Sequence, residues 1–85
     1  MNRYSVLLSN TALRQLDKLP DKLAEKLVID ILALADNPRP HGYKKLKDRN
    51  AFRIRKGDYR IIYEIFDKEF IVDVIAIGHR KEIYG

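Results

Sequence analysis

The sequence predicts an α+β domain in which an N-terminal strand and a two-helix hairpin precede a three-stranded meander, with the helices packed on an antiparallel β-sheet. Two periodicities predict this class. Residues 9–35 carry apolar side chains at helical spacing, whereas residues 52–78 suit strands, and a period of two sorts the side chains of residues 52–63 onto an apolar and a cationic face. The pairs Gly57-Asp58 and Asp67-Lys68 suit turns and divide the second segment into three strands.

The length of 85 residues predicts one domain, residues 1–85, with a single core. A hydrophobic content of 46% together with strong periodicity favours a folded chain over a disordered one. The absence of cysteine rules out disulfides and thiolate metal sites, and two histidines make a structural zinc site improbable, so we expect no metal and no cofactor. The sequence has neither a long apolar run nor a leader pattern, which predicts a cytoplasmic protein with no membrane partner.

The first strand is expected over residues 3–8, and Ser9 is expected to cap the helix that follows. Pro20 ends that helix, Asp21 is expected to cap the second helix, and Asn37-Pro38 stops it. The expected apolar stripes are Ala12, Leu13, Leu16 and Leu19 in the first helix, and Leu23, Ala24, Leu27, Val28, Ile31, Leu32 and Ala35 in the second. These stripes predict two amphipathic helices that pack on the sheet.

The first hairpin is predicted in detail, because Gly in the first position of a two-residue loop suits a type II′ turn. A Gly57-Asp58 loop pairs Lys56 with Tyr59, Arg55 with Arg60, Ile54 with Ile61, and Phe52 with Tyr63. Alternation then places Phe52, Ile54, Tyr59, Ile61 and Tyr63 on a core face. The other face holds Arg53, Arg55 and Arg60. Because like charges directly across a strand pair are unfavourable, we expect an anion between Arg55 and Arg60.

For the second hairpin, a two-residue loop at Asp67-Lys68 predicts the pairs Ile65–Phe70, Tyr63–Val72, Ile61–Val74 and Tyr59–Ala76, all on the core face. The opposite face then holds Ile62, Ile75 and Ile77, with Asp73 able to pair with an arginine there. Antiparallel topology returns the end of the last strand to the Gly57-Asp58 turn. We therefore expect Arg55, Arg60, His79 and Arg80 to meet at one end of the sheet, with Tyr84 a turn further on.

The positive charge is concentrated between Arg39 and Arg60, a segment with net charge +7, whereas the rest of the chain has net charge −2. Such a patch favours a polyanionic partner, with a solvated basic face as the alternative. Lys44, Lys45 and Lys47 suit phosphate contacts that position a nucleic acid without reading its sequence, or are ordinary solvated lysines.

Two motifs behind the helical hairpin carry a resemblance: Arg53-Ile54-Arg55-Lys56-Gly57-Asp58-Tyr59-Arg60 and Gly78-His79-Arg80-Lys81-Glu82-Ile83-Tyr84. With these motifs the chain resembles the RelE/ParE superfamily of toxins from toxin–antitoxin pairs, essentially from end to end. The resemblance implies a toxin that a cognate antitoxin protein holds inactive. RelE-like members are ribosome-dependent endoribonucleases that cut mRNA on the ribosome, whereas ParE-like members poison DNA gyrase and generally lack the cationic set. The cations at the matching positions favour the RelE-like branch.

The chemistry expected on that branch is attack of the RNA 2′-hydroxyl on the adjacent phosphate, with arginines stabilising the transition state. The expected cations are Arg60 and Arg80, assisted by Arg55. The expected RNA- or ribosome-binding residues are Lys44, Lys45, Lys47, Arg53 and Lys56.

The general base is the open position, because arginine stays protonated and cannot accept the proton. His79 is one candidate, with capping or packing at the strand end as its alternative role. Tyr84 is the other candidate, as a base or as a surface on which a nucleobase stacks.

Two other classes of function stay open from the sequence. One is a ParE-like inhibitor of DNA gyrase that has no nuclease activity. The other is an inactive relative that binds RNA or an antitoxin, in which the same arginines would serve contacts rather than chemistry.

Overall fold

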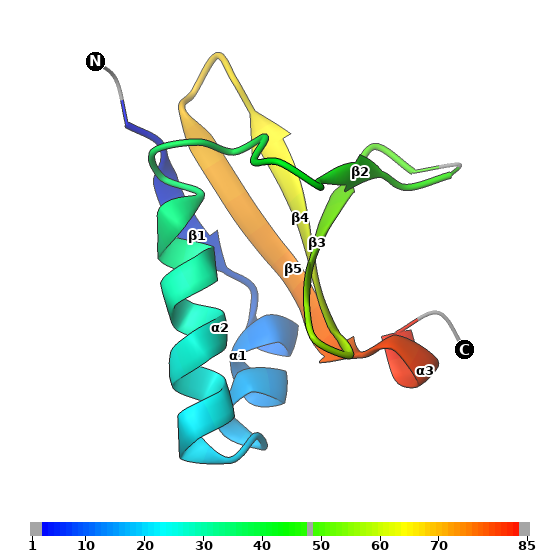
Figure 1. Ribbon diagram of the computed structural model, residues 1–85. Coiled ribbons are helices and arrows are strands. Elements are labelled where there is room, and N and C mark those ends of the chain that lie inside the picture. Colours follow the sequence, from blue (N-terminus) through cyan, green and yellow to red (C-terminus); the bar gives the residue numbers. More distant parts are fainter. Residues whose placement is uncertain (1–2, 48, 84–85) are drawn as a thin grey trace.

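The structure, a computed structural model, describes residues 3–47 and 49–83 (Figure 1). Its elements are β1 (Ser5–Leu8), α1 (Asn10–Asp17), α2 (Asp21–Ala33), β2 (Lys44–Lys45), β3 (Phe52–Lys56), β4 (Tyr59–Phe66), β5 (Ile71–His79) and α3 (Arg80–Ile83). Within these described residues, no helix is long and apolar enough to cross a membrane.

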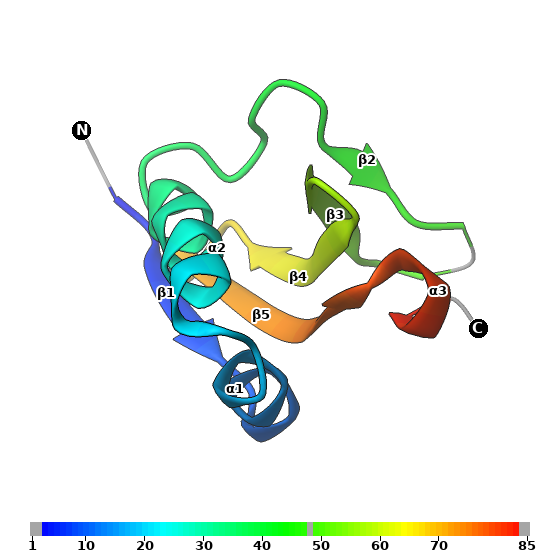
Figure 2. The same cartoon turned by 60° about the horizontal axis from the view of Figure 1, so that its bottom comes forward.

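The five strands form one sheet in the order β1-β5-β4-β3-β2, and α1 and α2 contribute to a single core with it (Figure 2). The predicted α+β class is confirmed, with two differences. The strand β1 runs parallel to β5, so the sheet is mixed rather than antiparallel. The segment expected to be a basic connection contains β2, a short strand that pairs with β3. We call the face turned toward α1 and α2 the helix face, and the opposite face the outer face.

The helix boundaries follow local chemistry. Ser9 caps α1 as predicted, since its hydroxyl accepts a hydrogen bond from the Ala12 backbone N–H at 3.1 Å. The prediction for Asp21 is wrong: Pro20 occupies the cap position, and Asp21 is the first helical residue of α2. A carboxylate in this first turn still lies at the positive end of the helix dipole. Of the predicted stripe on α2, Leu32 lies outside the core and is 59% exposed.

The first hairpin has the predicted register. Lys56 pairs with Tyr59, Arg55 with Arg60, and Ile54 with Ile61. Gly57 adopts a φ of +61°, the left-handed value that the first position of a type II′ turn requires. The predicted core face is also confirmed, because Ile54, Ile61 and Tyr63 are buried while Phe52 and Tyr59 pack against them.

The second hairpin differs from the prediction, because its turn has four residues, Asp67 to Phe70, rather than two. Phe66 pairs with Ile71 and Tyr63 with Val74, a shift of two residues that keeps the same side chains on the helix face. Phe70 turns with a φ of +54° and packs edge-on against Tyr4 instead of joining the core.

A β-bulge further along β5 changes the faces. Ile62 pairs with Ala76 while its neighbour Tyr63 pairs with Val74, so Ile75 is the extra residue. The bulge moves Ile77 onto the helix face, where it is 1% exposed, and moves Ala76 off it. The predicted assignment of these two residues is therefore wrong. Asp73, expected near the arginines, instead lies directly across from Glu64.

A side-chain cluster ties the β4–β5 turn to the two segments beside it. Asp67 accepts hydrogen bonds from the Tyr4 hydroxyl at 2.6 Å and from both terminal nitrogens of Arg39, at 3.1 and 2.8 Å. The Arg39 guanidinium, and then the Tyr4 hydroxyl, lower the pKa of the Asp67 carboxyl to about 2. Arg39, one of the cations in the basic segment, is thus held by a carboxylate of the protein itself.

We expect the substitution Asp67→Asn to destabilise the protein in a pH-dependent way. The pKa of Asp67 is lower in the folded protein than in an unfolded chain, so the ionised carboxylate stabilises the fold above about pH 4, and that stability is lost as the pH falls toward 2. The check is urea unfolding of both proteins from pH 2 to pH 7. The free energies of unfolding should differ most above pH 4 and converge at the acid end. A difference that persists unchanged at pH 2 would contradict the assignment.

Candidate functional site

Cations gather on the outer face, at the end of the sheet that holds the Gly57-Asp58 turn. Arg55 of β3 lies directly across from Arg60 of β4, and Arg60 lies across from Gly78 of β5. Residues that are directly opposite in neighbouring strands point to the same face of the sheet. Arg55 and Arg60 therefore face each other across the strand pair as predicted, and the residue across from Arg60 on its other side is a glycine.

Arg60 has an unusual environment for a charged group. Its side chain is only 7% exposed. Its Nη1 donates to the adjacent Tyr59 carbonyl at a long 3.5 Å, and its Nε has no hydrogen-bond partner among the described residues. A buried charge with a single long hydrogen bond is costly, so such a group needs a specific explanation. A bound anion beside the guanidinium would offset the charge.

Arg80 reaches the same end of the sheet through the backbone. Its N–H donates to the Asp58 carbonyl at 2.8 Å, which fixes the start of α3 beside the β3–β4 turn (Figure 1). The side chains of Arg55 and Arg80 are exposed. We call Arg55, Arg60 and Arg80 the cationic site.

The cationic site is not neutralised by the carboxylates that the structure describes. The ion pairs in residues 3–47 and 49–81 join Arg3 to Asp36, Arg39 to Asp67, and Lys56 to Asp30. No member of the cationic site belongs to any of these pairs.

His79 comes to the predicted end of the sheet but lies on the other face. It pairs with Tyr59, and the two rings pack edge to face with centroids 5.5 Å apart. Tyr59 packs against the core, so this contact is on the helix face. The His79 Nδ1 accepts a hydrogen bond from the Lys81 backbone N–H at 3.2 Å. This geometry supports the capping role, the second of the two roles that the sequence left open.

The predicted binding residues are spread over several positions. Lys44 lies directly across from Arg53 on the outer face, and Arg53 is 8% exposed. Lys45 faces the other way beside Phe52, and Lys47 is exposed in the turn that follows β2. The last predicted binding residue is Lys56, whose Nζ lies 3.7 Å from Asp30 on the helix face. Tyr84 lies outside the described residues.

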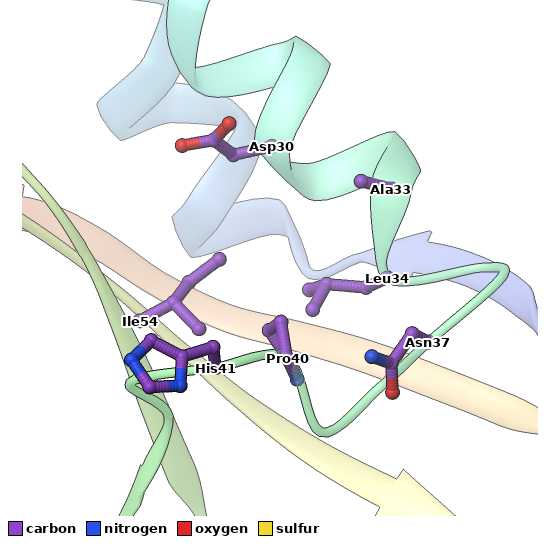
Figure 3. Close-up of a pocket in the computed structure, with 7 residues that line it drawn as sticks. All are labelled: Asp30, Ala33, Leu34, Asn37, Pro40, His41 and Ile54. Carbon is purple, nitrogen blue, oxygen red and sulfur yellow. The ribbon is translucent and has the colours of Figure 1, made fainter.

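A pocket of about 410 Å³ opens between α2, the segment after it and β3 (Figure 3). Its lining is mostly apolar, with Leu34, Pro40 and Ile54 on its walls and with Asp30 and His41 contributing polar groups. Ile54 belongs to the helix face, so β3 separates this pocket from the cationic site. His41 is exposed, as expected for a loop residue.

Two structural contributors to the site were missed from the sequence. Gly78 matters because it lies across from Arg60, a position that the bulge at Ile75 sets. Gln15 of α1 binds the backbone of β5: its Oε1 accepts from the Ile77 N–H at 2.6 Å. No local signal marks either role. The extra residue of the bulge is an isoleucine rather than a glycine, and Gln15 is one of several polar residues in an amphipathic helix.

Comparison with known proteins agrees with this fold. Residues 6–84 match the family described as the ParE toxin of type II toxin–antitoxin system, parDE. The chain is 35% identical over 83 residues to the toxin RelE of Mycobacterium tuberculosis, covering 95% of this chain and 86% of that protein. It is 27% identical over 86 residues to the mRNA interferase toxin RelE of Escherichia coli, covering 96% and 90%.

Solved structures show the same architecture. The toxin–antitoxin complex RelBE2 from Mycobacterium tuberculosis contains a chain with a TM-score of 0.82 and 31% identity, covering 92% of this chain and 99% of that one. The isolated Escherichia coli RelE toxin has a TM-score of 0.77 and 27% identity, covering 95% and 90%. Taken with the match over residues 6–84, these similarities show that the chain belongs to the RelE/ParE superfamily of type II toxin–antitoxin toxins.

Proposed function

We propose that this toxin is a ribosome-dependent endoribonuclease that cleaves mRNA and that a cognate antitoxin holds inactive. The observation that carries the proposal is Arg60, a buried guanidinium with a free Nε beside a second arginine. An RNA phosphate supplies the missing negative charge. The Escherichia coli relative carries the name mRNA interferase toxin, which supports the same activity here.

The proposed reaction is attack of the RNA 2′-hydroxyl on the adjacent phosphorus. The bond to the 5′-oxygen of the next nucleotide breaks, and the products are a 2′,3′-cyclic phosphate and a 5′-hydroxyl. Negative charge gathers on the phosphoryl oxygens in the transition state. Arg60 and Arg80, assisted by Arg55, stabilise that charge, and the planar fork of arginine matches two phosphate oxygens at once. Removing one preorganised donor of this kind costs about 3 to 4 kcal/mol in the barrier.

The proton acceptor is assigned by elimination within the proposal. The Nδ1 of His79 accepts the Lys81 N–H, so it would have to release this hydrogen bond before it could take a proton. While Nδ1 accepts, the ring hydrogen of the neutral imidazole is on Nε2, so that nitrogen cannot accept a proton either. We therefore assign His79 to capping α3 and Tyr84 to the role of base or stacking surface. The ribosome completes the site by orienting the mRNA, since positioning can lower a barrier substantially.

The capping assignment for His79 predicts different results for two substitutions. His79→Asn retains a side-chain oxygen that can accept the Lys81 N–H, so we expect cleavage on the ribosome within about fivefold of wild type. His79→Leu loses the acceptor, and we expect a decrease of tenfold or more. Single-turnover cleavage of ribosome-bound mRNA measures both. Equal and large losses in the two variants would instead identify the imidazole as the base.

The proposed antitoxin contact follows from charge. The solved relatives include complexes of RelE with the antitoxin RelB. In this chain the segment from Arg39 to Arg60 has a net charge of +7, which attracts an acidic or amphipathic segment of a partner protein. Binding of such a segment over the cationic site would exclude mRNA.

Expression in cells tests the proposed function against the gyrase alternative. We expect a rapid loss of mRNA and of translation, with 5′-hydroxyl ends at the cut sites. Arg80→Ala should abolish this loss, whereas the charge-matched Arg14→Ala, on the exposed surface of α1, should not. DNA-damage signalling with intact mRNA would identify a gyrase inhibitor instead, and unchanged growth would identify an inactive binding protein.

A further inference from the structure

The strand β5 extends beyond the strand that pairs with its outer edge. Pairing with β1 ends at Leu8 and Val74, whereas β5 continues to His79. Backbone groups along a strand edge need partners when they are covered by other parts of the protein. The chain turns after β1 into α1, which lies along this part of β5 (Figure 2).

Two side chains of this turn and helix take the place of the missing strand. The Ser9 hydroxyl donates to the Ile75 carbonyl at 3.1 Å, at the bulge itself. The Gln15 Oε1 accepts from the Ile77 N–H at 2.6 Å. The amide oxygen must be the atom in this contact, because a side-chain NH₂ group cannot accept a hydrogen bond. Gln15 therefore anchors β5 on the far side of the bulge.

The register that this anchor holds decides what lies next to Arg60. With the bulge, Gly78 is across from Arg60 and His79 is across from Tyr59. Without the bulge, the register set by Tyr63 and Val74 would continue unbroken, so that Ile62 would pair with Ile75 rather than with Ala76. Every side chain after Ile75 would then change face. Ile77 would leave the core and lie across from Arg60, at the register position that Gly78 now occupies.

We propose that Gln15 is a positioning residue for the cationic site: by accepting the Ile77 N–H it holds β5 in the bulged register that keeps Gly78 beside Arg60. The inference rests on the proposed ribonuclease function for its activity readout, and it has a structural readout of its own. Gln15 acts from the helix face through the backbone of β5 and does not touch the substrate.

Gln15 is a better probe of this role than Ser9. The Ser9 hydroxyl also caps α1, so its removal would disturb the helix as well as the bulge. Two substitutions at Gln15 form a matched pair. Gln15→Met keeps the length and helix preference of the side chain but removes the acceptor, and Gln15→Glu keeps an acceptor oxygen at the same reach. Val28→Ala, at a half-buried position of α2, controls for a general loss of stability.

The experiment measures three quantities on the full-length protein. NMR records the cross-strand contacts of Ile61 with Ile77 and the hydrogen exchange of the Ile77 amide. Single-turnover cleavage of ribosome-bound mRNA gives the rate at saturation, and ribosome binding is measured separately. For Gln15→Met we expect faster Ile77 exchange, weakened Ile61–Ile77 contacts and a rate lowered tenfold or more, with ribosome affinity within about threefold. Gln15→Glu should keep the wild-type register and a cleavage rate within about threefold of wild type. Val28→Ala should also keep both the register and the rate.

Several outcomes would overturn the inference. One is a wild-type register and rate in Gln15→Met; another is a slipped register with full activity. If Val28→Ala lowers the cleavage rate as much as Gln15→Met does, the loss comes from reduced stability and not from a changed register. If the wild-type protein cleaves no RNA, the proposed function fails, and inorganic phosphate becomes the probe: its effect on the Arg60 Nε–H resonance should be lost in Gln15→Met and kept in Gln15→Glu. A phosphate response that is the same in all three proteins would overturn the positioning role.

Discussion

Replacing Arg60 by methionine is expected to abolish cleavage without destabilising the protein. Methionine fills a similar volume, removes a buried charge and removes an Nε that has no partner among the described residues. We expect a free energy of unfolding equal to that of wild type or about 1 to 3 kcal/mol higher. The rate of ribosome-bound mRNA cleavage should fall about 100- to 1,000-fold, the effect of removing one preorganised donor to a transition-state anion.

The contrast between the two measurements identifies the role of Arg60. Urea unfolding gives stability and single-turnover cleavage gives activity. Arg14→Met, which removes the same charge from the exposed surface of α1, should change neither by much. If Arg60→Met instead lowered stability by several kcal/mol, the guanidinium would be a structural group, and its burial would no longer argue for a bound phosphate.

Replacing Lys44, Lys45 and Lys47 together by alanine is expected to weaken ribosome association while sparing the chemical step. These lysines are exposed on and after the edge strand β2. If each contacts one RNA phosphate, the slope of log affinity against log salt should decrease by about 2, since a single-strand contact contributes roughly 0.7. Affinity at low salt should fall about 10- to 100-fold, and the cleavage rate at saturation should stay within about twofold.

The triple variant has a charge-matched control on the helices. Lys18, Lys22 and Lys26 are also exposed, and their replacement by alanine lowers the net charge by the same amount at positions away from β2. We expect this control to keep most of the affinity and of the salt slope. Equal slopes in both variants would show that general charge attracts the ribosome and that the β2 lysines make no phosphate contacts.

The first hairpin shows what local sequence can specify. Gly57 supplies the left-handed turn, and the alternation from Phe52 to Tyr63 selects the buried face, so turn and pattern agree on one register. The confrontation of Arg55 with Arg60 follows directly from that register. The helical hairpin was equally accessible, because Ser9, Pro20 and the apolar stripes mark its limits, although Asp21 was misassigned as a cap.

The second hairpin shows where local sequence stops being sufficient. Asp67-Lys68 suits a short turn, but Asp67 is engaged by Tyr4 and Arg39 from distant parts of the chain, and the turn has four residues. The bulge at Ile75 likewise depends on contacts from α1, through Ser9 and Gln15. Neither feature has a signal within its own strand.

The sequence by itself determined the fold class, the helical hairpin, the first hairpin and the presence of three arginines at one end of the sheet. The two hairpins depend on neighbours within a few residues, where spacing and turn chemistry act directly, and Arg80 joins the other two arginines because the last strand returns antiparallel to the same end. Only the tertiary structure decided that Arg60 is buried with an Nε that no described residue binds, that Gly78 lies across from it and that His79 faces the helices. Those properties depend on a one-residue bulge, and side chains more than 60 positions away in the chain hold that bulge in place.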